Sequence, residues 1–166
     1  MWNLTSDEVS LRIAAPADVI YAVVADVTRM PQLSPEVVSC EWVADDGPKV
    51  GARFRARNRA RRGPSWSNTP EVIAADLGRE FAFVRRERMF GELVWRYQLE
   101  PDDSGTTVRE SYQVTKAVPL VSRLAMRLFY GAKDRPADLH EGMNRTLARV
   151  AAVTEVGPTS LRPTTP

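Results

Sequence analysis

Turn signals recur at regular intervals through the middle of the chain and divide it into short runs rich in β-forming residues. Glycine, proline and aspartate mark such turns because each either permits or imposes the backbone angles that a tight reversal needs. Short β-rich runs between closely spaced turns predict an antiparallel meander. The turns are Gly47-Pro48, Gly63-Pro64, Asp76-Leu77-Gly78, Gly91 and Asp102-Asp103-Ser104-Gly105.

Within these runs the side chains alternate with a period of two, which is typical of strands with one buried face. The clearest case is the run from Arg53 to Arg62, whose arginines we expect to face water. On later strands the alternation brings apolar and aromatic residues together, and we expect those faces to form one concave wall. Arg53, Arg55, Arg57 and Arg59 share one face of the first run, and Phe54, Ala56, Asn58 and Ala60 share the other. The later sets are Phe81 and Phe83, then Leu93, Trp95, Tyr97 and Leu99, then Val108, Glu110, Tyr112 and Val114.

Helical spacing appears at both ends of the meander. After an alternating strand that ends at Ile13, the sequence predicts a helix over about 16 to 26 and a short second helix that Thr28 caps and Pro35 ends. After Val118 apolar residues recur every three or four positions, with interruptions expected at Gly131 and Pro136. These residues are Leu120, Leu124, Leu128, Leu139, Met143, Leu147 and Val150.

This order predicts an α+β domain, in which a curved antiparallel β-sheet is wrapped around a long C-terminal α-helix and two short helices follow the first strand. We expect one domain over residues 5–155. Residues 156–166, rich in proline and threonine, are expected to form a flexible tail.

Composition excludes several classes of function. With 23 Lys and Arg against 21 Asp and Glu, the net charge of +2 is too small to favour a nucleic-acid partner. The single Cys40 and single His140 cannot form a Cys/His metal site, and no glycine spacing suits a nucleotide phosphate, so we expect no metal and no cofactor. The start lacks a signal-peptide pattern and no run is long enough to cross a membrane, which predicts a cytoplasmic location. The oligomeric state stays open.

The order of elements and several local motifs resemble the START/Bet v 1-like (SRPBCC) superfamily, with its helix-grip fold, over residues 5–155. The motifs look like the bacterial polyketide cyclase/dehydrase-type branch. They are Ala14-Ala15-Pro16-Ala17-Asp18-Val19-Ile20-Tyr21, the stretch from Trp66 to Val72, Phe81-Ala82-Phe83, Trp95-Arg96-Tyr97, and Gly105-Thr106-Thr107-Val108-Arg109-Glu110-Ser111. This resemblance implies a hydrophobic cavity between sheet and helix, used across the superfamily to bind or carry lipids, sterols and polyketides and in some members to cyclise them.

The candidate ligand-binding residues are those expected on the concave wall or on the C-terminal helix. Aromatic rings offer apolar area together with a polar tip, and methionine adapts to irregular apolar shapes. The same residues also fit ordinary core packing, so both readings stay open. The candidates are Phe54, Asn58, Trp66, Phe83, Trp95, Tyr97, Glu110, Tyr112, Met126, Tyr130 and Met143.

Three residues are candidates for proton transfer, although no catalytic residue is identified. Burial would raise the pKa of Glu110 and make it suitable as a general acid or base. Alternatively, Glu110 could pair with an inward-facing arginine or lie at a solvent-exposed end of the sheet. Tyr112 shares its face. His140 on the C-terminal helix is the third, and an exposed histidine fits its pattern better. Cys40 is expected to be a small buried hydrophobic residue.

Three functions compete at this stage. The leading one is noncatalytic binding or transport of a hydrophobic small molecule, lipid or polyketide-like. The alternative is an enzyme of the polyketide cyclase/aromatase type, acting by enolisation and dehydration. The third is a regulatory interaction module that uses arginine-rich hairpins, although such arginines are more simply solvated hairpin tips. These arginines are Arg57, Arg59, Arg61 and Arg62 at one turn, and Arg85, Arg86 and Arg88 at another.

Overall fold

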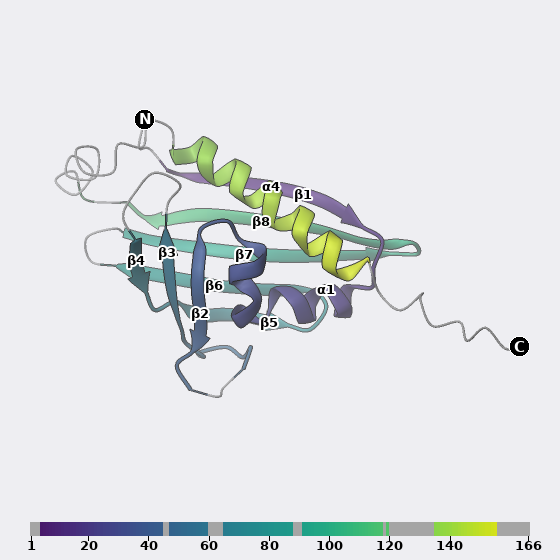
Figure 1. Ribbon diagram of the computed structural model, residues 1–166, viewed down its shortest axis with the longest axis horizontal. Coiled ribbons are helices and arrows are strands. Elements are labelled where there is room, and N and C mark those ends of the chain that lie inside the picture. Colours follow the sequence, from purple (N-terminus) through teal and green to yellow (C-terminus); the bar gives the residue numbers. More distant parts are fainter. Residues whose placement is uncertain are drawn as a thin grey trace, which may run out of the picture.

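The computed structural model describes residues 4–44, 47–59, 65–87, 91–117, 119 and 135–155. The elements follow the predicted helix-grip order (Figure 1). The helical elements are α1 (Ala17–Val24), the 3-10 helix η1 (Val27–Arg29), α2 (Met30–Leu33) and α4 (Arg135–Thr154). The strands are β1 (Ser6–Ile13), β2 (Val37–Trp42), β3 (Phe54–Arg59), β4 (Ser65–Asn68), β5 (Glu71–Asp76), β6 (Glu80–Glu87), β7 (Gly91–Asp102) and β8 (Gly105–Lys116).

The strands form a five-stranded antiparallel sheet, ordered β1-β8-β7-β6-β5, and a three-stranded antiparallel sheet, ordered β2-β3-β4. An isolated bridge between Arg53 and Glu71 continues the β3–β4 register into β5, so the two sheets meet as one bent surface. Thr69 and Pro70 separate β4 from β5. Proline has no N–H for the ladder, which explains why the β-rich run after Pro64 divides here into two strands.

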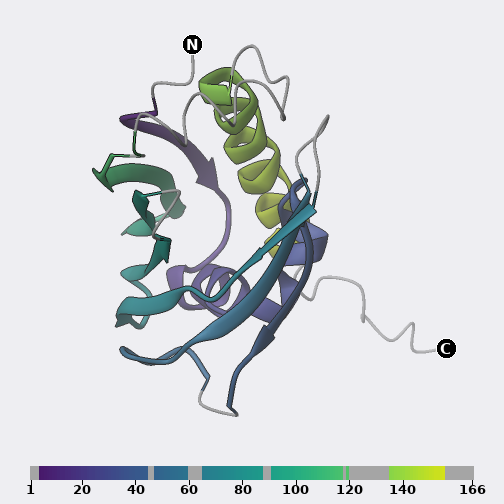
Figure 2. The ribbon, with the colours of Figure 1, turned by 90° about the vertical axis from the view of Figure 1, so that its left-hand side faces the viewer.

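The sheet curves strongly, and α4 lies on its concave side beside β1 and β8 (Figures 1 and 2). Alternate strand residues point toward this side, which we call the inner face. The helix presents one stripe of buried side chains to the rest of the fold, spaced by three and four residues as predicted. The stripe consists of Leu139, Met143, Thr146, Leu147, Val150 and Thr154.

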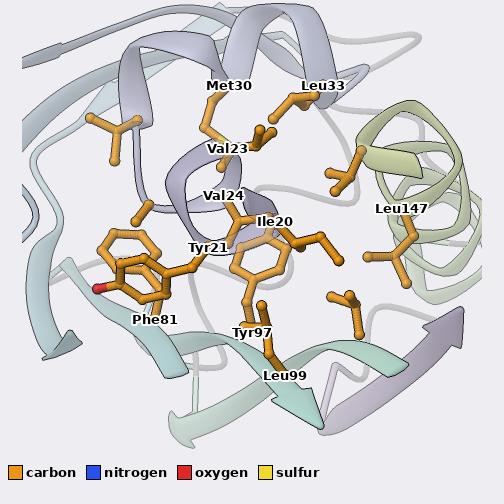
Figure 3. Packing of buried hydrophobic residues seen from close by; sticks show 14 of the residues in the cluster. Ile20, Tyr21, Val23, Val24, Met30, Leu33, Phe81, Tyr97, Leu99 and Leu147 are labelled. Atoms are coloured by element: carbon orange, nitrogen blue, oxygen red, sulfur yellow. The ribbon is translucent and has the colours of Figure 1, made fainter. Parts of the chain in front are cut away.

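Helix α1 fills one end of the space between sheet and α4 (Figure 3). Ile20 and Val24 are fully buried there, and the Tyr21 ring meets Phe81 edge to face with centroids 6.5 Å apart. Leu147 of α4 belongs to the same cluster. Burial of such large side chains on three elements fixes α4 against the sheet, because each contributes roughly 1.5–3 kcal/mol on leaving water.

The residue that caps the second helical segment differs from the prediction. Asp26, rather than Thr28, is the N-cap of η1, and its carboxylate accepts from the Thr28 backbone N–H at 3.1 Å. The Thr28 hydroxyl donates to the same oxygen at 2.6 Å. The sequence offers two good caps close together, and the one at the extended backbone position before the turn performs the role.

The outer face of the five-stranded sheet carries arginines that have carboxylate partners. Arg12 pairs with Asp102 at 2.6 Å, Arg86 with Glu71 at 3.1 Å, Arg96 with Glu80, and Arg109 with Glu8 at 3.6 Å. Among the described helices none has the length and apolar character needed to span a membrane.

Candidate ligand-binding site

A buried carboxylate and phenol lie opposite each other on the inner face. The register pairs Tyr97 of β7 directly with Glu110 of β8, so both side chains leave the sheet on the same side. The Tyr97 hydroxyl donates to Glu110 Oε1 at 2.9 Å, and Tyr97 and Glu110 are 3% and 4% exposed. The other carboxylate oxygen, Oε2, has no hydrogen-bond partner within the described parts of the chain.

Burial controls the ionisation of this pair. Loss of hydration raises the pKa of Glu110 to about 8, although the hydrogen bond from Tyr97 opposes that rise. Burial likewise raises the pKa of Tyr97 well above its usual value, and the Glu110 carboxylate beside it adds to the rise. Glu110 is therefore largely protonated at neutral pH, and its unpartnered Oε2 can carry the proton. The sequence pattern predicted that Glu110 points inward, and its partner is a tyrosine rather than an arginine.

Aromatic side chains flank this pair along the inner face. Trp95 lies directly opposite Tyr112, with ring centroids 5.4 Å apart. Phe83 lies beside Phe54 of the three-stranded sheet at 5.1 Å. Tyr112 and Phe54 are buried, whereas Trp95 and Phe83 are only partly covered. The structure thus joins the predicted residues of both sheets into one aromatic surface, where partly covered rings remain available for contact.

A cluster of charged residues lies at one end of the inner face. Arg135, at the start of α4, forms a two-pronged ion pair with Glu36, and its guanidinium lies 5.9 Å from the ring centroid of Trp66. Arg85 Nε lies 3.3 Å from Glu87 Oε1. Burial lowers the pKa of Arg85, and the nearby charge of Arg135 lowers it further, whereas Glu87 raises it.

The sequence analysis missed this charged cluster. It placed Arg85 and Arg86 together at a solvated turn, yet strand alternation puts them on opposite faces, with Arg85 inward opposite Leu93. The inward position of Arg85 could have been predicted from the sequence, because Arg85 follows Phe81 and Phe83 at alternate positions of the same strand. The pairing of Arg135 with Glu36, far away in sequence, was not detectable from any local pattern.

The remaining residues singled out from the sequence differ in how deeply they are buried. Asn58 and Met143 are buried, Asn58 on the inner face of β3 and Met143 on the inward stripe of α4. His140 is exposed, as its pattern suggested, and its Nδ1 lies 2.9 Å from Asp7 Oδ2. Cys40 is partly covered, and burial raises its pKa to about 12. Met126 and Tyr130 lie outside the described residues.

Metal-ligating residues and surface grooves are the other features that could form a binding site. Within the described ranges no three His, Cys, Asp or Glu residues are grouped as a metal site.

A surface groove of about 440 Å³ lies between the β1–α1 connection and the β7–β8 turn. None of the candidate site residues lines it. The groove residues are Ala14, Ala15, Pro16, Ala17, Pro101, Asp102, Asp103, Ser104 and Gly105.

The order of the elements and the curved sheet around α4 define a helix-grip domain of the START/Bet v 1-like superfamily. A START superfamily protein from Mycobacterium smegmatis superimposes with a TM-score of 0.67 at 17% identity, covering 92% of this chain and 98% of that one. More specifically, the model of the family described as polyketide cyclase / dehydrase and lipid transport matches residues 5–155. The chain belongs to this family.

Two relatives are more similar in sequence. The solution structure of a Polyketide_cyc-like protein from Corynebacterium glutamicum is 32% identical, with a TM-score of 0.51 and coverage of 93% of this chain and 88% of that one. A candidate polyketide cyclase from Streptomyces cyaneus is 31% identical over 101 residues. That alignment covers 57% of this chain and 64% of the relative, so the chain spans less than two thirds of the relative's length.

Proposed function

We propose that this protein binds a hydrophobic small molecule between the inner face of the sheet and α4, and that Glu110 orients it. One observation carries the proposal: the buried Glu110 carboxyl uses one oxygen on Tyr97 and leaves Oε2 without a partner in the described structure. Unsatisfied buried polar atoms are rare because each costs roughly 1–3 kcal/mol. A ligand oxygen that accepts a hydrogen bond from Oε2 would remove that cost.

The ionisation of Glu110 narrows the chemistry of this ligand. With a pKa of about 8, the carboxyl is neutral at pH 7 and donates from Oε2 while Oε1 accepts from Tyr97. The complementary ligand group is therefore a carbonyl, ether or hydroxyl oxygen, and an anionic head group is disfavoured at this position. The apolar body of the ligand would contact the partly covered rings of Trp95 and Phe83.

A second candidate function is supported by the same raised pKa. A carboxylic acid that stays protonated at neutral pH is suited to general acid catalysis. In a cyclase or dehydratase, Glu110 would donate its proton to a ligand carbonyl oxygen during enolisation, or to a departing hydroxyl that leaves as water. The carboxylate left behind, stabilised by the Tyr97 hydrogen bond, would accept the proton released from the adjacent ligand carbon. The Streptomyces cyaneus relative is named for this activity.

Binding of two matched probes tests the proposal. Naphthalene and 1-acetylnaphthalene share a ring system but only the second carries a carbonyl oxygen, and both would be titrated into delipidated protein at pH 6.5. We expect the ketone to bind about five- to tenfold more tightly, since one net hydrogen bond is worth about 1 kcal/mol. Failure of both probes to bind would overturn the proposal.

Two variants separate binding from catalysis. Glu110→Met removes the donor and should abolish the preference for the ketone, while Glu110→Gln retains a donor and should keep it. An enzyme would lose turnover in Glu110→Gln without losing binding, whereas a carrier has no turnover to lose. Glu100→Gln, at an exposed glutamate on β7, is the matched control. A ketone preference that survives Glu110→Met would show that Glu110 does not contact the ligand.

A further inference from the structure

The outer face of the three-stranded sheet carries a row of arginines, most of which have no acidic partner among the described residues. Arg55, Arg57 and Arg59 of β3 are exposed, and so is Arg53 just before the strand. Arg55 pairs with Glu41 at 3.0 Å. Across the described residues the other three form no ion pair. We call this surface the basic face, and it consists of Ser39, Glu41, Arg53, Arg55, Arg57, Arg59, Ser65 and Ser67.

The neighbours of the three unpaired arginines explain why they lack partners. Arg57 lies opposite Ser39 and Ser67. Arg59 lies opposite Ser65, and its Nε donates to the serine Oγ at 3.4 Å. Arg53 lies opposite Glu71, but that carboxylate accepts from Arg86 instead, at 3.1 Å. Hydroxyls leave the positive charge of a guanidinium uncompensated, and they can themselves donate to a phosphate oxygen.

The five-stranded sheet of the same protein provides an internal comparison. Its outer face also carries arginines, and there Arg12, Arg86, Arg96 and Arg109 each contact a carboxylate. The contrast is also visible in the total charge. Four arginines and one glutamate give the basic face a net charge of +3, whereas the whole chain carries +2. The rest of the chain therefore carries a net charge of −1.

The surroundings of the basic face favour a lipid surface over a nucleic acid. Proteins that hold single-stranded nucleic acid stack bases on exposed aromatic rings. The aromatic residues of these three strands, Trp42, Phe54 and Trp66, alternate with the basic face and lie on the inner side. Exposed aliphatic side chains occur nearby instead: Val43, beside Arg53, is 53% exposed, and Val50, just before β3, is 66% exposed.

We propose that the basic face docks on the surface of an anionic lipid bilayer. The unpaired arginines would meet lipid phosphates, the serine hydroxyls would donate to the same oxygens, and Val43 and Val50 would enter the interfacial layer. Each basic side chain near an anionic membrane surface strengthens binding by roughly fivefold. Three unpaired arginines together correspond to about a hundredfold. This inference goes beyond ligand binding and does not depend on it.

Vesicle binding without any ligand tests the inference. The full chain would be floated with vesicles of pure phosphatidylcholine and with vesicles containing 30% phosphatidylglycerol. We expect binding only to the anionic vesicles, and we expect it to weaken steeply between 50 and 300 mM salt because the attraction is screened. Equal binding to both vesicle types, or binding that is insensitive to salt, would overturn the proposal.

Matched variants locate the contact. Arg53→Gln, Arg57→Gln and Arg59→Gln combined should weaken vesicle binding by about a hundredfold, while the corresponding triple lysine variant should retain most of it. Arg12→Gln with Arg109→Gln, on the outer face of the other sheet, should leave binding unchanged. Loss in this control, or no loss in the triple glutamine variant, would place the contact elsewhere. Binding to a 20-nucleotide RNA but to neither vesicle type would also reject the lipid partner. Titration of 1-acetylnaphthalene into the same variants reports separately on the proposed ligand site.

Discussion

Glu110 and Tyr97 are opposite residues on neighbouring strands, and the phenol donates its hydrogen bond to the carboxyl at 2.9 Å in the buried interior. Burial raises the pKa of Glu110 to about 8 even though this contact lowers it, so Glu110 is mainly a proton donor at neutral pH rather than an anion. The pair therefore links the packing of the sheet to the chemistry offered to a ligand.

Glu110 should make the stability of the protein depend on pH. The native state retains this proton up to about pH 8, whereas an ordinary glutamate releases it near 4.5. Between these values the unfolded state binds fewer protons, so the free energy of unfolding falls as pH rises, by about 1.4 kcal/mol per pH unit. The contribution is fully favourable below pH 4.5 and is lost above pH 8.

Urea unfolding at pH 5, 6, 7 and 8 would measure this dependence. The free energy of unfolding should fall more steeply with pH for the wild-type protein than for Glu110→Gln from pH 5 to pH 8. The Glu100→Gln variant should follow the wild type. Parallel curves for the wild type and Glu110→Gln would mean that Glu110 ionises normally.

Tyr97→Phe should destabilise the protein by about 1–3 kcal/mol, because it leaves a second oxygen of the buried Glu110 without a partner. It should also raise the pKa of Glu110, since the Tyr97 hydrogen bond lowers that pKa. The pH at which stability stops falling would then move upward. Tyr112→Phe is the control, because Tyr112 lies on the same strand as Glu110 and is equally buried, whereas the hydrogen bond to the Glu110 carboxyl comes from Tyr97. An equal shift in this control would rule out a specific role for Tyr97.

The attachment of α4 should depend on its buried stripe. Leu147→Ala removes a side chain that is 1% exposed and should cost about 2–5 kcal/mol of unfolding free energy. Val153→Ala removes a side chain that is 44% exposed on the same helix, and it should change the unfolding free energy by less than about 0.5 kcal/mol. Thermal and urea unfolding of both variants would measure the difference. Similar losses would show that α4 packs differently from the structure.

Cys40 should be unreactive in the native protein. Burial raises the pKa of its thiol to about 12, so very little of the thiolate that attacks disulfide reagents exists at pH 8. Reaction with Ellman's reagent should be at least about a hundredfold slower in buffer than in 8 M urea. A native rate close to the urea rate would show that the thiol is exposed.

The strand faces were readable from the sequence because side chains in a regular stretch of strand alternate between its two faces. That single regularity predicted the exposed arginines of β3 and the inward sets around Phe81, Tyr97 and Glu110. The same rule, applied across a whole strand, would have placed Arg85 inward. It was overlooked because Arg85 and Arg86 were judged by composition, as part of a basic turn, instead of by register.

Local pattern thus determined the α+β order, the face on which each strand residue lies and the inward position of Glu110. Only the tertiary structure decided the partners: that Tyr97 bonds Glu110, that Arg135 reaches Glu36, and that Arg57 has serines beside it while Arg109 has glutamates. Periodicity is set by the backbone geometry of neighbouring residues. Pairing depends on which distant segments come together and on how much water they exclude, and both are properties of the folded chain as a whole.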